Sequence, residues 1–313
     1  MSETPAPVRL RSTPQIEARV AERLLRRIDA RAADLVELAR ALIRIPTVNP
    51  PGEGYAEAVR LIGERLAGRG FEVVYERALG APGDSEARPR CNLVARVESR
   101  VAGPTVHISG RIDVAPPGAG WSLDAFAGEL RDGRLFGRGA AEVKGALAAA
   151  LIALETVKDE LPRLPGALEL SVTADGLSGG AGGLGFLGRL NYLEPPRVDH
   201  LIVLEAGGAD AVAAAGGTAE TTLLPALAHA IERVAGRAPR RIAAPAASGL
   251  HWLVSADKIA SLAAYGPGDA GAGSAADESV AVADLLLAAK VLALAAHRVL
   301  GSAPDATGGP PQP

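Results

Sequence analysis

The chain has 313 residues, enough to bury a full hydrophobic core as one large domain or two smaller ones. Its net charge of −3 gives no electrostatic reason to expect a nucleic-acid or membrane-surface partner, and a single cysteine excludes an internal disulfide and a cysteine-rich metal site. The first residues lack an apolar signal segment, and the longest apolar stretch is too short for a membrane span. We therefore expect a cytoplasmic protein.

The chain is expected to form one core over residues 14–301, flanked by disordered tails at 1–13 and 302–313. Apolar spacing from Pro14 predicts one long helix, or two helices with a break near Ala30. Further helices are predicted over 53–70, 141–161, 186–197, 223–236 and 277–301. Strands are predicted over 71–77, 91–99, 104–110, 166–176, 198–208 and 258–271, with a hairpin over 128–140. This alternation predicts an α/β fold, a three-layer αβα sandwich around a mixed, mostly parallel sheet.

Residues 106–121 begin with a predicted strand that ends in a charged pair. The apolar run VHIS is followed by Gly110, Arg111 and Asp113, and then by a Pro-Pro-Gly turn and Trp121. A strand that ends in a short polar segment and a tight turn is a common way to build the rim of an active site.

Several long motifs, in order, resemble the M20 metallopeptidase family. They are LIRIPTVNPPG, GRIDVAPPGAGWSLDAFAGELRDGRLFGRGAAEVKG, LSVTADGLSGGAGGLGFL and YGPGDAGAGSAADESVAVADL. The family contains the acetylornithine deacetylases, succinyl-diaminopimelate desuccinylases and aminoacylases, which are di-zinc amidohydrolases with a zinc-exopeptidase-like core. The resemblance runs from about Ala33 to about Leu300. It also implies a lid and dimerisation domain after Glu205, where this chain has only a short segment, so we expect a core without that domain.

The resemblance implies a two-zinc site, but several of its positions carry other residues here. The family's first His ligand corresponds to Arg111, the bridging Asp to Glu142, and the last His to Ser274. The family's Glu-Glu pair, which supplies the general base and a ligand, corresponds to Gly176 and Leu177. Two acidic positions are kept, Asp113 beside the first ligand and Glu205 at the end of a strand.

Arginine has no lone pair for zinc, and glycine and leucine offer no side-chain donor. The sequence therefore predicts a vestigial site with no catalytic residue, no metal ligand and no cofactor. We expect Asp113, Glu142 and Glu205 to converge at the carboxyl edge of the sheet. Their mutual repulsion would be relieved by Arg111, whose planar fork can bind two carboxylates. We hypothesise an ion-pair cluster of Arg111 with Glu142 and Glu205.

The leading interpretation is a non-catalytic pseudoenzyme that acts as an interaction or structural subunit, either in a hetero-complex or in an altered homo-oligomer. One alternative is an amidohydrolase of the N-acyl amino acid type with an altered metal site built from Asp113, Glu142 and Glu205. Another is a sensor in which Arg111 binds a small carboxylate ligand. The five histidines lack partners at ligand spacing, and His107, inside a strand, is expected to be packed or hydrogen-bonded in the core.

Overall fold

The structure, a computed structural model, describes residues 14–217, 223–243, 259, 261–269, 271 and 275–302. The tail predicted at 1–13 lies outside these residues, as does the tail predicted at 302–313 apart from Ser302. Within the described part, no helix is both long enough and apolar enough to cross a membrane.

An eight-stranded sheet forms the centre of the molecule, in the order β1-β2-β6-β3-β7-β10-β8-β9. The strands are β1 (Glu72–Arg77), β2 (Cys91–Glu98), β3 (Thr105–Arg111), β6 (Ala167–Thr173), β7 (His200–Leu204), β8 (Ala211–Gly217), β9 (Arg240–Arg241) and β10 (Ser261–Tyr265). Four adjacent strands, β6, β3, β7 and β10, form a parallel group. At one end of this group β2 pairs antiparallel with β6, and at the other end β8 pairs antiparallel with β10. The prediction of a mixed, mostly parallel sheet is confirmed.

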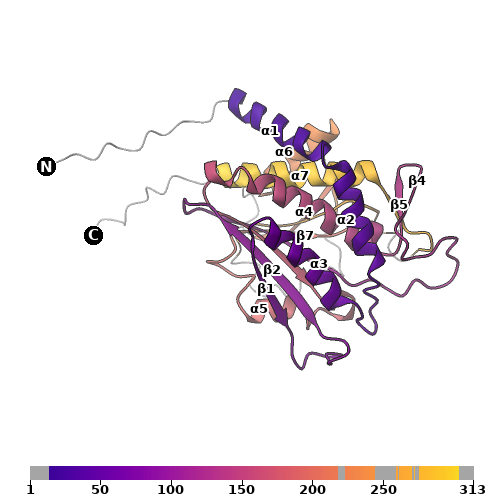
Figure 1. The fold of residues 1–313 in the computed structure, drawn as a ribbon. Coiled ribbons are helices and arrows are strands. Elements are labelled where there is room, and N and C mark those ends of the chain that lie inside the picture. The colour runs from indigo at the N-terminus through magenta and orange to yellow at the C-terminus, as the bar shows by residue number, and fades with distance from the viewer. Residues whose placement is uncertain are drawn as a thin grey trace.

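Helices cover both faces of the sheet (Figure 1). They are α1 (Pro14–Asp29), α2 (Ala32–Arg44), α3 (Tyr55–Gly68), α4 (Gly145–Lys158), α5 (Leu184–Arg189), α6 (Leu223–Ala235) and α7 (Val282–Gly301). All except α5 contribute to one large apolar core on one face. Helix α5 packs Leu184 and Leu187 on the other face, against Val94, Val203 and Leu262. This arrangement confirms the three-layer sandwich.

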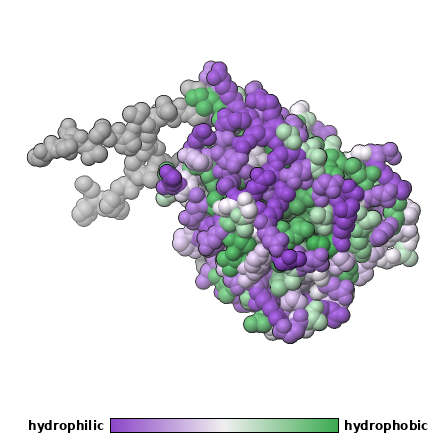
Figure 2. Space-filling model, viewed as in Figure 1, coloured by the Kyte–Doolittle hydropathy of each residue, from purple (hydrophilic) through white to green (hydrophobic). Residues whose placement is uncertain are grey.

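The N-terminal apolar stripe packs on the chain's own core. Helix α1 ends at Asp29 and α2 begins at Ala32, so of the two alternatives left open by the sequence, two helices with a break near Ala30 are present. Leu24 and Ile28 are fully buried, and Arg23 donates to the carboxylate of Glu160 at 2.6 and 3.1 Å. The outward side of this region is mostly hydrophilic (Figure 2).

A small second sheet lies beside the start of α4. It contains β4 (Glu129–Arg131), β5 (Arg134–Phe136) and β11 (Ser279–Ala281). Asp132 and Gly133 both have positive φ, 46° and 72°, as a type I′ turn requires, so the predicted hairpin is confirmed. The π-helical turn η1 (Ala140–Lys144) precedes α4, and short 3₁₀ turns occur at η2 (Leu161–Arg163) and η3 (Gly176–Ser178).

Strand β8 was not predicted from the sequence. It lies in the segment that we interpreted as a short linker after Glu205. No strand was expected there because the alanines and glycines of this segment have low strand propensity. Residues 218–222, between β8 and α6, lie outside the described residues. The expected absence of a lid domain stays a prediction.

Candidate functional site

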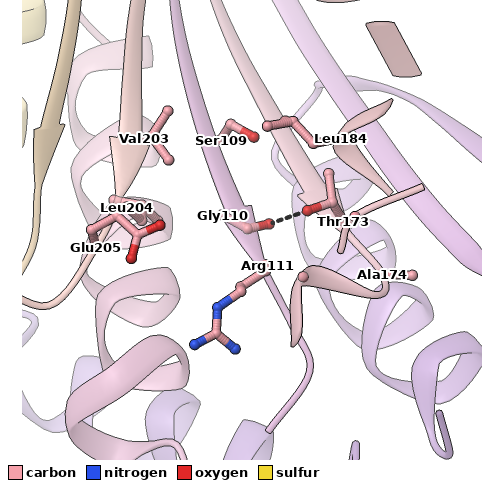
Figure 3. A pocket seen from close by; sticks show the side chains of 11 residues that line it. Ser109, Gly110, Arg111, Thr173, Ala174, Leu184, Val203, Leu204 and Glu205 are labelled. Carbon is pink, nitrogen blue, oxygen red and sulfur yellow. Dashed lines mark hydrogen bonds between the residues drawn. The ribbon is translucent and has the colours of Figure 1, made fainter. Parts of the chain in front are cut away.

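Three parallel neighbours, β3, β6 and β7, end at the same edge of the sheet. Arg111 is the last residue of β3 and lies opposite Thr173 of β6, while Glu205 directly follows β7. Arg111, Glu205 and Thr173 line one pocket at this edge (Figure 3). The cavity volume is about 20 Å³, and a buried water needs roughly 10–15 Å³. The enclosed space of this pocket, called the pocket floor below, is therefore about the size of one water molecule.

Arg111 is held by two neighbours. Its Nη1 donates to the backbone oxygen of Asp113 at 2.5 Å, and its Nη2 forms an ion pair with Glu142. The side chain is only 13% exposed. Nearby carboxylates raise the pKa of Arg111 even though burial opposes this, so the guanidinium stays charged. These two contacts use two of its five N–H donors.

Gly176 makes room for Arg111. A Cβ added to Gly176 would lie 2.4 Å from Cδ and 3.1 Å from Cβ of Arg111. Any larger residue at this position would therefore collide with the arginine. The glycine and the arginine are sterically complementary, a relation that the sequence does not reveal because the two residues are far apart along the chain.

Asp113 organises the loops around the pocket. It is fully buried and accepts hydrogen bonds from the backbone N–H groups of Gly176, at 3.1 Å, and Leu177, at 2.7 Å. The side-chain amide of Asn49 donates to it at 2.9 Å. Asp113 therefore ties the η3 turn to the loop before α3, and Leu177 itself projects outward with 41% exposure.

Glu142 lies on the η1 turn, which a second glutamate holds in place. The carboxylate of Glu278 accepts the backbone N–H groups of Gly139, Ala141 and Glu142 at 2.8–3.0 Å. One oxygen of Glu142 pairs with Arg111. The other, Oε2, is buried without a hydrogen-bond partner among the described residues.

Glu205 has the most perturbed carboxyl group of the pocket. Its pKa is raised to about 7, mainly because burial disfavours the charged form; the charge of Arg111 opposes this shift, and the charge of Glu142 adds to it. Within the described chain Arg111 pairs directly with Glu142, but no ion pair joins it to Glu205. The hypothesised cluster is thus right for Glu142 and wrong for Glu205, whose carboxyl group influences Arg111 only through space.

The donor set of the pocket does not fit two zinc ions. In the described part of the chain, no group of three or more His, Cys, Asp or Glu side chains is arranged to hold a metal ion. The guanidinium of Arg111 lies beside Asp113 and Glu142, where it supplies the positive charge itself. Ser274, which the resemblance places at a further ligand position, lies outside the described residues.

Comparison with known proteins decides the family. The family model for "Peptidase family M20/M25/M40" matches residues 107–298, more than half of the chain. The chain belongs to peptidase family M20.

The M20 chain is 37% identical over 146 residues to a succinyl-diaminopimelate desuccinylase of Rhodospirillum centenum, covering 46% of this chain and 36% of that protein. It is 39% identical over 144 residues to the Granulibacter bethesdensis protein of the same name, covering 46% and 33%. The M20 chain thus spans about a third of the length of these relatives.

Solved structures show the same fold. Human carnosine dipeptidase 1 superimposes with a TM-score of 0.73 at 12% identity, covering 90% of this chain and 99% of that one. An M20 family metallo-carboxypeptidase from Sulfolobus solfataricus gives a TM-score of 0.68 at 11% identity, covering 85% and 99%. At such low identity these likenesses concern the fold alone.

These comparisons correct one prediction from the sequence. The M20 chain was expected not to be an enzyme, but the family is enzymatic and the curated relatives are named as desuccinylases. We inferred this expectation from the residues that stand at the family's zinc-ligand positions. Such replacements change how the site can work, but they do not show that catalysis is absent. The predicted role as an interaction subunit finds no support in these relatives.

Proposed function

We propose that this chain hydrolyses the amide bond of an N-acyl amino acid at the pocket between β3 and β7. Its membership of the M20 family and the names of its desuccinylase relatives support this reaction class. The observation that carries the proposal is geometric: the half-buried carboxyl group of Glu205 and the fixed guanidinium of Arg111 line the same pocket. Burial also raises the pKa of Glu205 to about 7. A group that titrates near neutrality can both accept and return a proton, as amide hydrolysis requires.

Glu205 is the proton-transfer group in this proposal. Its carboxylate takes a proton from a water molecule at the pocket floor while the water oxygen attacks the amide carbonyl carbon. The same carboxyl group then gives the proton to the departing nitrogen as the C–N bond breaks. The proton therefore passes from water to amine, and Glu205 returns to its starting state.

Arg111 stabilises the negative charge that develops on the carbonyl oxygen. Its donors to Asp113 and Glu142 fix the guanidinium, so little reorganisation is needed when the charge appears. Because the pocket floor holds only a water-sized group, the substrate carbonyl lies at the mouth of the pocket. These steps use only side chains of the described residues, and none of them is routed through a metal.

The substrate class follows from the names of the curated relatives, which are succinyl-diaminopimelate desuccinylases. Purified protein should therefore release free amine from an N-succinyl amino acid, measured by derivatising the new amino group. Glu205→Gln should lower kcat by at least about 100-fold, the usual contribution of a positioned acid–base group.

A matched control is Glu64→Gln, because Glu64 is an exposed acid on α3, far along the chain from the pocket residues. This variant should retain the wild-type rate. Equal rates for Glu205→Gln and the wild type, or no amine release from any N-acyl amino acid tested, would contradict the proposal.

A further inference from the structure

A buried line of polar side chains runs along β3 and β6 to the floor of the pocket. Nδ1 of His107 lies 2.9 Å from Oε1 of Glu169, and Nε2 lies 2.8 Å from Oγ of Ser171. Oγ of Ser171 lies 2.9 Å from Oγ of Ser109, which lines the pocket together with Glu205 (Figure 3). All four side chains of this line are fully or almost fully buried.

Strand register places this line on the same face as the pocket residues. His107 lies opposite Glu169, and Ser109 lies opposite Ser171, in adjacent parallel strands. Alternate residues of a strand share a face, so His107 and Ser109 lie on the same side of β3 as Arg111. On the β7 side, His107 is opposite the apolar Leu201. The line therefore leads away from the pocket along β3, with an apolar side chain beside His107 on the β7 side.

Two arginines hold Glu169 in its charged form. Arg197 and Arg96 pair with its carboxylate at 2.5 and 3.3 Å. Burial alone would raise the pKa of Glu169, but hydrogen bonding from His107 and the charge of Arg197 outweigh it, and the pKa is lowered. An anionic Glu169 requires a proton on Nδ1 of His107, so Nε2 is the atom that exchanges a proton with Ser171.

The two hydroxyl groups can point either way along the line. When Nε2 of His107 is bare, Ser171 donates to it, Ser109 donates to Ser171, and Ser109 presents a lone pair to the pocket. When Nε2 carries a proton, the bonds reverse, and Ser109 presents an O–H donor to the pocket. Every group stays hydrogen-bonded in both states, so neither direction leaves a buried polar atom unpaired.

The size of the pocket decides between two uses of this arrangement. A Ser-Ser-His-Glu line could activate Ser109 as a nucleophile, but Ser109 is only 1% exposed, and the cavity of about 20 Å³ beside it has room for a water molecule and not for an acyl group. Proton transfer needs only a water molecule or one carboxyl oxygen at the floor. The geometry therefore favours proton transfer.

We propose that Ser109, Ser171, His107 and Glu169 form a proton relay that takes a proton from a carboxylic acid at the pocket floor. This inference rests on the proposed hydrolysis, which leaves the acyl product as a carboxylic acid. The acid O–H bond breaks, its proton joins Ser109, the Ser109 proton passes to Ser171, and the Ser171 proton bonds to Nε2 of His107. The product becomes a carboxylate, which an amine attacks poorly, and the imidazolium is balanced by Glu169. The proton returns to solvent through the pocket when the product leaves.

Binding of succinate to Glu205→Gln tests the relay without requiring turnover. This background removes Glu205, which would itself take up a proton beside a bound anion. Calorimetry in buffers of different ionisation enthalpy measures how many protons the protein takes up at neutral pH. Succinate should bind with proton uptake, because a carboxylate on Ser109 favours the state in which His107 carries two protons.

Adding Ser171→Ala to this background should abolish the uptake, because it breaks the line, and Ser171→Thr should restore it by supplying a hydroxyl. His200→Gln is the matched control, since His200 is a buried histidine bonded to Ser261 at 2.6 Å on the same sheet, and it should leave the uptake unchanged.

Uptake that survives Ser171→Ala, or no succinate binding, overturns the relay. If proton-linked binding is present but wild-type protein releases no amine, the proposed hydrolysis fails and the relay stands.

Discussion

At the scale of single residues, Gly176 and Arg111 form a complementary pair. Gly176→Ala places a Cβ within 2.4 Å of the Arg111 side chain, so it should lower the free energy of unfolding by about 1–3 kcal/mol. In an Arg111→Ala background the main obstruction is gone, and the same change should cost at least about 1 kcal/mol less. Urea unfolding of the two single variants and the double variant measures this coupling. Strictly additive effects would show that the two positions do not depend on each other.

Glu205 should make stability depend on pH. Its folded pKa of about 7 lies above the ordinary value of 4.5, so the fold favours the neutral form. This contribution is fully present below pH 4.5 and is lost as pH rises towards 7. Between pH 4.5 and pH 8, the wild type should lose about 3 kcal/mol relative to Glu205→Gln, which cannot ionise. Urea unfolding of both proteins at the two pH values checks this, and parallel pH dependences would refute it.

The sequence located some residues of the pocket and one of their contacts. Motif positions alone placed Arg111, Glu142 and Glu205 near one another, and the pairing of Arg111 with Glu142 follows that expectation. Predicting the distances within a charged cluster requires the backbone path, so the separation of Glu205 from the ion pair was missed. His107 was expected to be hydrogen-bonded in the core. Its partner Glu169 could not be identified, because the contact depends on the register of two strands 62 residues apart.

At the scale of elements, one carboxylate holds the turn that carries Glu142. Glu278, just before β11, caps three backbone N–H groups of η1 and pairs with Arg138 at 3.2 Å. Glu278→Ala should lower the free energy of unfolding by about 3–5 kcal/mol, because it removes one partner of a buried ion pair and leaves donors without an acceptor. Chemical denaturation gives the value. A loss below 1 kcal/mol would mean that the turn forms without this cap.

Local sequence predicted most elements but not the irregular ones. The hairpin around Asp132 carries a strong local signal, its turn dipeptide, whereas the apolar stripe around Ala30 allowed either one helix or two. The π-helical form of η1 has no such signal, and the carboxylate that accepts its backbone N–H groups, Glu278, lies in a distant part of the chain. Strand β8 forms because β10 pairs with it, in spite of its alanines and glycines.

At the scale of the whole molecule, the sheet and its two helical layers follow the M20 fold, and the positions of the pocket follow from strand order. The sequence predicted this architecture because alternating elements and ordered motifs both pointed to it. The protein partner, the cytoplasmic location and the missing lid domain stay predictions. In the proposed function, Arg111 and Glu205 support hydrolysis, whereas the sequence-based interpretation assigned them no catalytic role.

The most direct test measures amine release by protein that has been stripped of metal with a chelator. Wild-type protein should hydrolyse an N-succinyl amino acid at the same rate before and after stripping, and Glu205→Gln should be at least about 100-fold slower in both states. Activity that appears only when zinc is added, and that Glu205→Gln leaves unchanged, would contradict the proposed roles of Arg111 and Glu205.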